Sequence, residues 1–183
     1  MQKCQKWGWL VGISLCLTAL LCLGWAVFGT SVAHATTALL TCEGNETITY
    51  SPGITNTPRV VTGWADDTVT SCTALSGSGP SSGTASFTVT IPNATCTSIT
   101  HPTYTVTYNW NNREQSVVSF TSTTTTKLAT GETLVISTGT VLSGVYAGET
   151  AQRTLLNLNT DLTACFTSQG LQKNAGPFTL AIL

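Results

Sequence analysis

The chain has 183 residues, of which 8% are charged, and its formal net charge is −1. Beyond the first 35 residues, five basic residues stand against eight acidic ones (a balance of −3) without a basic cluster. This excludes a nucleic-acid-binding protein, because such proteins need Lys and Arg to displace counterions. Threonine is abundant, and its branched side chain favours the pleated surface of a sheet. The composition therefore predicts an all-β domain.

Residues 1–35 predict an export signal. Two lysines precede a long uncharged and mostly apolar stretch, and a small-x-small cleavage motif follows at Ala33 to Ala35. The apolar stretch exceeds the usual signal core and approaches the roughly 20 residues that span a bilayer. A cleaved signal peptide and an uncleaved membrane anchor are therefore both open. Either way, residues 36–183 form a single domain outside the cytoplasm, secreted or extracellular in the first case and membrane-anchored in the second.

The first hairpin is expected from two alternating segments that flank a turn at residues 54–58. If Cys42 lies opposite Cys72, the same register places Tyr50 opposite Trp64, with all four side chains on one face. A bulge at Gly44, or at the aspartate pair that follows Trp64, would shift this register.

The four cysteines that follow the leader predict two disulfides, because an even number in an exported domain is typical of a disulfide framework. Zinc is the alternative, but there is no Cys-x-x-Cys motif, and His101 is the only histidine beyond the leader. The register of the first hairpin favours Cys42–Cys72, which leaves Cys96–Cys165.

Further alternating segments extend the strand pattern to the end of the chain. They are residues 84–92, a strand that begins at Tyr104, residues 115–123, 132–144 and 151–159, a segment around Cys165, and residues 177–183. Ser, Gly and Pro at 76–83 predict a flexible loop. The pattern predicts an antiparallel, immunoglobulin-like sandwich of eight or nine short strands, preceded by a hydrophobic signal helix.

The segment 101–120 predicts a second hairpin. Asn111 and Asn112 suit a two-residue turn, but that turn would set the apolar faces of the two strands out of phase. An odd loop of three or five residues keeps them in phase, and a three-residue loop pairs Val106 with Val118. We therefore expect the odd loop.

Two interpretations of this hairpin tip remain. In the first, the asparagines provide turn chemistry and Trp110 covers the apolar face. In the second, Trp110 with Asn109, Asn111 and Asn112 forms a ligand surface on which a sugar ring stacks, since aromatic rings and a few polar groups are typical of ligand sites.

No catalytic group, cofactor or metal is expected. The Gly-x-Ser-x-Gly pattern at 79–83 needs a strand–turn–helix elbow and a histidine base, and it lies in a loop with no predicted helix after it. Asp66 and Asp67 are adjacent and would point to opposite faces of a strand, which favours a turn or a solvated edge; Glu43 and Glu46 are interpreted in the same way. The chain is therefore predicted not to be an enzyme.

Three motifs carry a resemblance: Cys42 with TYSPGITNTPR, the central VTYNWNN, and LTAC ending at Cys165. With these, the chain resembles small four-cysteine exported proteins of filamentous soil bacteria, which implies export and an immunoglobulin-like sandwich and adds no catalytic residue. We expect a non-enzymatic protein of the cell surface or medium that acts by binding or structural interaction. Its expected partner is a protein or polysaccharide surface, with membrane contact only through an uncleaved leader. The alternatives are a carbohydrate-binding module that uses Trp64 or Trp110, and a secreted protease inhibitor.

Overall fold

The computed structural model describes residues 37–99, 102–129, 131–158 and 162–183, all within one compact unit, 36–183. The export signal expected at 1–35 and the histidine at 101 lie outside the described residues. Within the described ranges, no helix has the length and apolar character that a membrane span requires.

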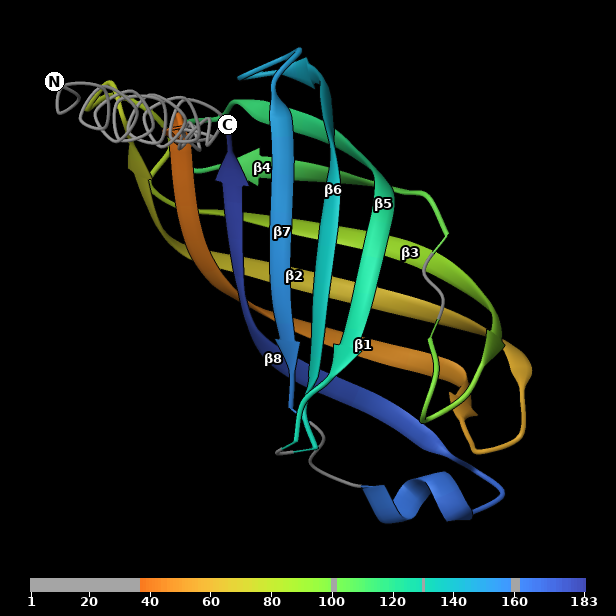
Figure 1. Ribbon diagram of the computed structural model, residues 1–183. Helices are drawn as coiled ribbons and strands as arrows, with labels where there is room; N and C mark the ends of the chain where they lie inside the picture. The colour runs from red at the N-terminus through yellow and green to blue at the C-terminus, as the bar shows by residue number, and fades with distance from the viewer. Residues whose placement is uncertain (1–36, 100–101, 130, 159–161) are drawn as a thin grey trace, which may run out of the picture. The chain divides into compact units, whose positions relative to one another are not determined.

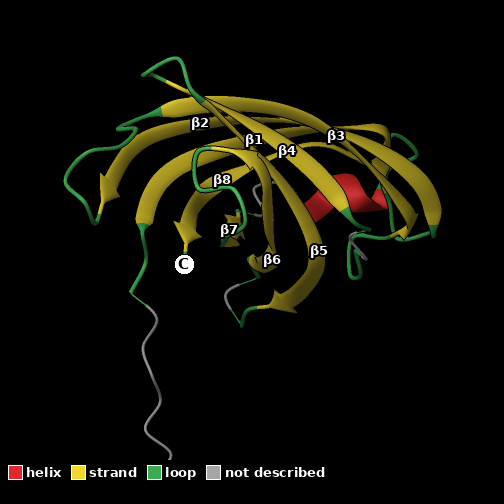
Figure 2. Ribbon diagram, turned by 90° about the horizontal axis from the view of Figure 1, so that it is seen from above, coloured by secondary structure: helices red, strands yellow, loops and turns green. Residues whose placement is uncertain are grey.

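Eight antiparallel strands follow one another around a closed barrel (Figures 1 and 2). Each strand pairs with the next in the chain, and the last returns to pair with the first. The strands are β1 Leu40–Ile54, β2 Arg59–Ala74, β3 Gly83–Ala94, β4 Tyr104–Trp110, β5 Gln115–Lys127, β6 Thr133–Gly144, β7 Thr150–Asn157 and β8 Leu171–Ile182. Figure 1 shows β5, β6 and β7 crossing over β1, β2 and β3, with the strongly bent β8 joining the two sets.

The expected immunoglobulin-like sandwich was wrong, because the sheet closes on itself instead of forming two separate layers. The strands are also longer than expected, up to 16 residues in β2. Long strands twist strongly, and a meander in which every strand pairs with its sequence neighbour curls until its first and last strands meet. A sandwich would need strands that cross between sheets. Inward and outward side chains alternate in both architectures, so the alternation alone did not distinguish them.

The register of β1 and β2 explains why one tryptophan lies outside the barrel. Cys42 and Cys72 are directly opposite each other, as expected, and form a disulfide with Cα atoms 4.0 Å apart. A bulge at Glu43/Gly44 then shifts the register by one residue, so that Trp64 pairs with Thr49. A shift of one residue turns a side chain to the opposite face. Trp64 is therefore 47% exposed, and its expected pairing with Tyr50 was wrong.

The β4–β5 hairpin has the expected register and loop. Val106 pairs with Val118, and residues 111–113 form a three-residue loop. Arg113, with φ of 70°, supplies the left-handed residue that closes loops of this length. Trp110 faces the interior at 4% exposure, and its Nε1–H donates to Ser116 Oγ at 2.9 Å. Its ring therefore completes the core at this end of the barrel.

The seam between β3 and β4 is the shortest ladder in the barrel. It has two ladder pairs, both beside the β4–β5 hairpin loop. Toward the other end, the rings of Phe87 and Tyr104 stack across the seam with centroids 5.4 Å apart, and Tyr104 stacks in turn on Phe120 of β5 at 5.1 Å. The segment around Cys165 is not a strand but a short 3₁₀ helix, η1 (Leu162–Phe166), which precedes β8.

Candidate functional site

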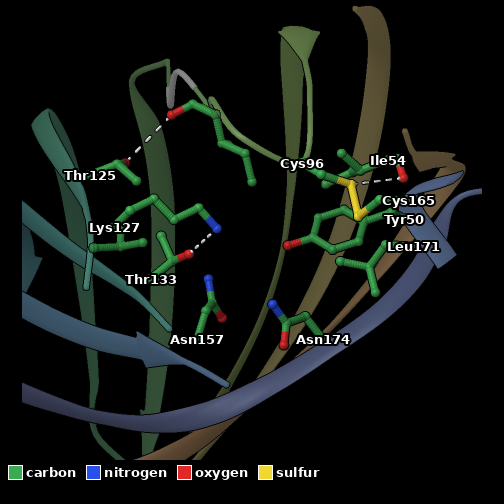
Figure 3. Close-up of a pocket in the computed structure, with 12 residues that line it drawn as sticks. Tyr50, Ile54, Cys96, Thr125, Lys127, Thr133, Asn157, Cys165, Leu171 and Asn174 are labelled. Atoms are coloured by element: carbon green, nitrogen blue, oxygen red, sulfur yellow. Dashed lines mark hydrogen bonds between the residues drawn. A yellow bond between two sulfur atoms is a disulfide. The ribbon is translucent and has the colours of Figure 1, made fainter. Parts of the chain in front are cut away.

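One end of the barrel carries a pocket whose walls combine apolar and polar side chains (Figure 3). It lies where β1 and β7 end, where β5 turns into β6, and where β8 begins. We refer to it as the mouth pocket. Its lining residues are Tyr50, Ile54, Cys96, Ile99, Thr125, Lys127, Thr133, Val135, Asn157, Cys165, Leu171 and Asn174.

Two asparagines face the mouth pocket because they continue the inward-facing rows of their strands. Asn157 follows the buried Leu155 on β7, and Asn174 precedes the buried Phe178 in the same phase on β8. Residues two apart on a strand point to the same face. Both amides are buried, at 5% and 7% exposure. These positions would suit apolar residues, and departures from a core pattern are expected at functional sites.

Lys127, the last residue of β5, supplies a positive charge at the rim of the mouth pocket. Its Nζ donates to Thr133 Oγ1 at 2.7 Å. The side chain stays largely exposed, yet its partial burial lowers the pKa of the ammonium group. An ammonium carries three donors, so the bond to Thr133 does not saturate it. Lys127 can therefore bind an acceptor or an anionic group placed in the mouth pocket.

Tyr50 and Asn174 present polar groups from the opposite wall. Figure 3 shows the hydroxyl of Tyr50 and the amide of Asn174 pointing toward the side that carries Lys127 and Asn157. Burial, and then the negative charge of Glu46, raises the pKa of the Tyr50 phenol. The phenol therefore stays neutral and can donate or accept a hydrogen bond.

The Asn157 carbonyl is the most distinctive group of the mouth pocket. Its Oδ1 is buried and has no hydrogen-bond partner among the described residues. A buried acceptor without a partner costs about 1–3 kcal/mol. The adjacent cavity has a volume of about 20 Å³, enough for one water-sized group. The mouth pocket can thus take a hydroxyl or N–H group that donates to Asn157.

The second disulfide forms part of the apolar wall. Cys96 and Cys165, 69 residues apart in the chain, join the segment after β3 to η1, beside Ile54 and Leu171. Both expected pairings are therefore confirmed, and zinc is excluded because the sulfurs are bonded to each other. Two disulfides are typical of proteins in an oxidising compartment.

A separate ionic cluster lies inside the barrel, and sequence reasoning missed it. Arg153 Nη2 lies 2.7 Å from Glu46 Oε2 and 2.9 Å from Asp67 Oδ1, with all three residues buried. The Tyr108 hydroxyl approaches the other oxygen of Asp67 at 3.5 Å, and the Arg153 guanidinium stands 4.6 Å from the centroid of the Phe178 ring. The cluster joins β1, β2 and β7 across the core.

The cluster contains one more acid than base, and burial is the main cause of the shifted pKa of Asp67. Burial raises that pKa to about 6; Arg153 opposes the rise and Glu46 adds to it. The expected solvated position was therefore wrong for Asp67 and Glu46. The alternation along the strands indicated the inward positions. Glu46 lies two residues before the buried Ile48 on β1, and Arg153 lies two residues before the buried Leu155 on β7, so each points to the same face as its apolar neighbour.

The residues of the expected ligand surface at the hairpin tip do not share a face. Trp110 points inward, while Asn109, Asn111 and Asn112 are exposed. Asn111 instead holds the neighbouring loop, because its Oδ1 accepts from the backbone N–H of Ser81 at 3.1 Å. The Gly-x-Ser-x-Gly pattern runs through this loop and ends at Gly83, the first residue of the strand β3.

The chain matches no protein-family model, curated protein or solved structure. Among the described residues, no group of three His, Cys, Asp or Glu side chains is placed to hold a metal ion. The mouth pocket offers an ammonium, two amides and a phenol against an apolar wall, and polar groups of these kinds can orient a bound molecule by hydrogen bonds.

Proposed function

We propose that this chain is an exported, non-enzymatic protein of the cell surface or medium that binds the polar end of a small ligand in the mouth pocket. The observation that carries the proposal is the buried Asn157 carbonyl without a hydrogen-bond partner among the described residues. A ligand hydroxyl or N–H donates to this carbonyl, while an acceptor on the same ligand binds Lys127. The small cavity admits only the end of the ligand, so the remainder extends outward along the rim.

The two disulfides and the Thr-rich exterior support export. Disulfides persist in oxidising compartments, and both of these are part of the folded barrel. Binding without catalysis is supported by the site itself, where an ammonium, amides and a neutral phenol orient a ligand by hydrogen bonds. The buried acids Glu46 and Asp67 are already engaged by Arg153.

The test is a ligand screen with matched variants. Hydroxy acids, amino acids and short amides are screened by saturation-transfer NMR against the purified protein, Asn157→Leu and Lys127→Met. Compounds bound by the wild type should lose at least about tenfold in affinity in both variants, since tenfold corresponds to about 1.4 kcal/mol. Leu matches the size of Asn and removes the unsatisfied acceptor, so Asn157→Leu should keep or gain stability.

Two exposed residues of the same types provide the controls. Asn109→Leu and Lys173→Met change an asparagine and a lysine on the outer surface. Both controls should bind the screened compounds as the wild type does. Binding that survives in Asn157→Leu and Lys127→Met, or no compound of the three classes bound by the wild type, would contradict the proposal.

A further inference from the structure

The exposed Trp64 lies in the middle of a polar surface. It projects from β2 at 47% exposure, with Thr49 of β1 opposite it on one side and Thr88 of β3 on the other. Two residues along β2, Asp66 also points outward, where its Oδ1 accepts from Ser86 Oγ at 2.6 Å. An indole ring bordered by hydroxyl groups and a carboxylate offers one flat apolar face with hydrogen-bonding groups at its edges.

The same side of the barrel carries an open groove of about 430 Å³. It is lined by Glu43, Gly44, Asn45, Thr70, Thr154, Leu156, Pro177, Phe178 and Thr179. Gly44, which stands at the Glu43/Gly44 bulge, forms part of its wall. A Cβ on Gly44 would lie 2.8 Å from the ring of Phe178 and 2.5 Å from the carbonyl oxygen of Thr68.

Trp64 and the groove belong to one continuous surface. Thr49, which pairs with Trp64, and Asn45, which lines the groove, are both exposed and four residues apart on β1. At about 3.4 Å per residue this separation is roughly 14 Å. We call this surface the outer face: the exposed side chains of β1, β2 and β8 from Trp64 to the groove.

The charges of the outer face are nearly balanced. Its exposed side chains include two carboxylates, Glu43 and Asp66, and one cation, Lys173, which pairs with Thr49 from β8. The remainder are mainly Thr, with the amide of Asn45. A polyanion would require an excess of cations. An added peptide strand would need a free sheet edge, and the closed ladder leaves none on this face.

We propose that the outer face binds a neutral polysaccharide, with one sugar ring stacked on Trp64 and the chain continuing over Thr49 into the groove. The faces of a sugar ring are rich in C–H groups and pack on an aromatic ring, while its hydroxyls bond with Thr, Asn and carboxylate oxygens. The roughly 14 Å between the two ends requires several linked units, so affinity rises with chain length.

The test uses retention of the purified protein on insoluble cellulose, chitin and xylan, with pectate as the anionic comparison. Calorimetry with the matching mono-, tri- and tetrasaccharides measures the dependence on length. The wild type should be retained on at least one neutral polymer and bind its tetrasaccharide more tightly than its monosaccharide. Trp64→Ala should lose at least tenfold in affinity, and Asn45→Ala should weaken the tetrasaccharide more than the monosaccharide.

Phe166→Ala is the matched control, because Phe166 is also an exposed aromatic residue, 84% accessible, but lies on η1. It should be retained as the wild type is, as should the mouth-pocket variant Asn157→Leu. Loss of binding in Asn157→Leu with retention in Trp64→Ala would overturn this inference and favour the mouth pocket. Strongest retention on pectate, or no retention on any neutral polymer, would also overturn it.

Discussion

Asp66 and Asp67 are adjacent in the chain but lie on opposite sides of the barrel wall. Asp66 accepts a hydrogen bond from Ser86 on the outside, and Asp67 pairs with Arg153 on the inside. One strand therefore contributes to the proposed polysaccharide surface and to the buried ionic cluster at neighbouring positions. The cluster can be altered without touching the outer face, which makes stability and binding separable by mutation.

Replacing Arg153 should strongly destabilise the barrel. Arg153→Met leaves Glu46 and Asp67 buried without their cation, and breaking a buried ion pair in this way costs about 3–5 kcal/mol. Urea denaturation followed by circular dichroism measures the loss. Lys173→Met, which removes an exposed cation, should change the free energy of unfolding by less than about 0.5 kcal/mol.

Neutralising the two acids should rescue the Arg153 variant. In the triple variant Arg153→Met, Glu46→Gln and Asp67→Asn, no buried charge of the cluster remains, and much of the lost stability should return. A triple variant less stable than Arg153→Met alone would show that the acids contribute by hydrogen bonds rather than by charge.

Stability should fall as the pH rises through the pKa of Asp67. That pKa is raised from its ordinary 3.8 to about 6 in the folded protein, so the folded state binds the proton more tightly than the unfolded chain. The resulting contribution is complete below about pH 4 and lost above about pH 6, and it amounts to about 3 kcal/mol. Denaturation at intervals between pH 4 and 7 measures it, and Asp67→Asn should flatten the profile in this window.

Opening the Cys96–Cys165 disulfide should affect the mouth pocket more than opening Cys42–Cys72. Each bridge is expected to add roughly 2–4 kcal/mol, with more from the longer loop of 69 residues than from that of 30. Only Cys96–Cys165 lines the mouth pocket. Double Ser variants of each pair, compared by denaturation and hydrogen exchange, should show lost protection at Asn157 and Leu171 only when Cys96–Cys165 is absent.

The two tryptophans should differ sharply in their effect on stability. Trp110→Ala removes a buried ring and leaves Ser116 without its donor, which should cost about 3–5 kcal/mol. Trp64→Ala removes an exposed ring and should change the free energy of unfolding by less than about 1 kcal/mol. Thermal unfolding of both variants distinguishes them, and comparable losses would contradict the assigned register of β1 and β2.

Pairing within hairpins could be predicted from the sequence because inward and outward side chains alternate over short distances. Val106 opposite Val118 and Cys42 opposite Cys72 follow from keeping apolar faces in phase. The bulge at Glu43/Gly44 was recognisable only as an alternative, because a single extra residue leaves the alternation on both sides intact. That one residue decided the position of Trp64.

Barrel closure and the mouth pocket depend on contacts between distant segments. Nothing local to β1 or β8 indicates that they pair, and Asn157 and Asn174 approach the same pocket from different strands. A turn or solvated edge was expected for Asp67 and Glu46, and no position was predicted for Arg153. Their inward phase was the better guide, since a buried charge is tolerated where an opposite charge meets it.

The pairing of β1 with β8 also determines when folding can be completed. Leu40 lies opposite Ile182, so the first strand finds its second neighbour only when the last strand of the domain has emerged. Until then, a partly formed meander exposes backbone donors and acceptors along one side of β1, where other unfinished chains can attach. Because this contact spans almost the whole domain, it is expected to form late and slowly. Under the export proposed above, a chain that crosses the membrane unfolded would close its barrel only after passage is complete.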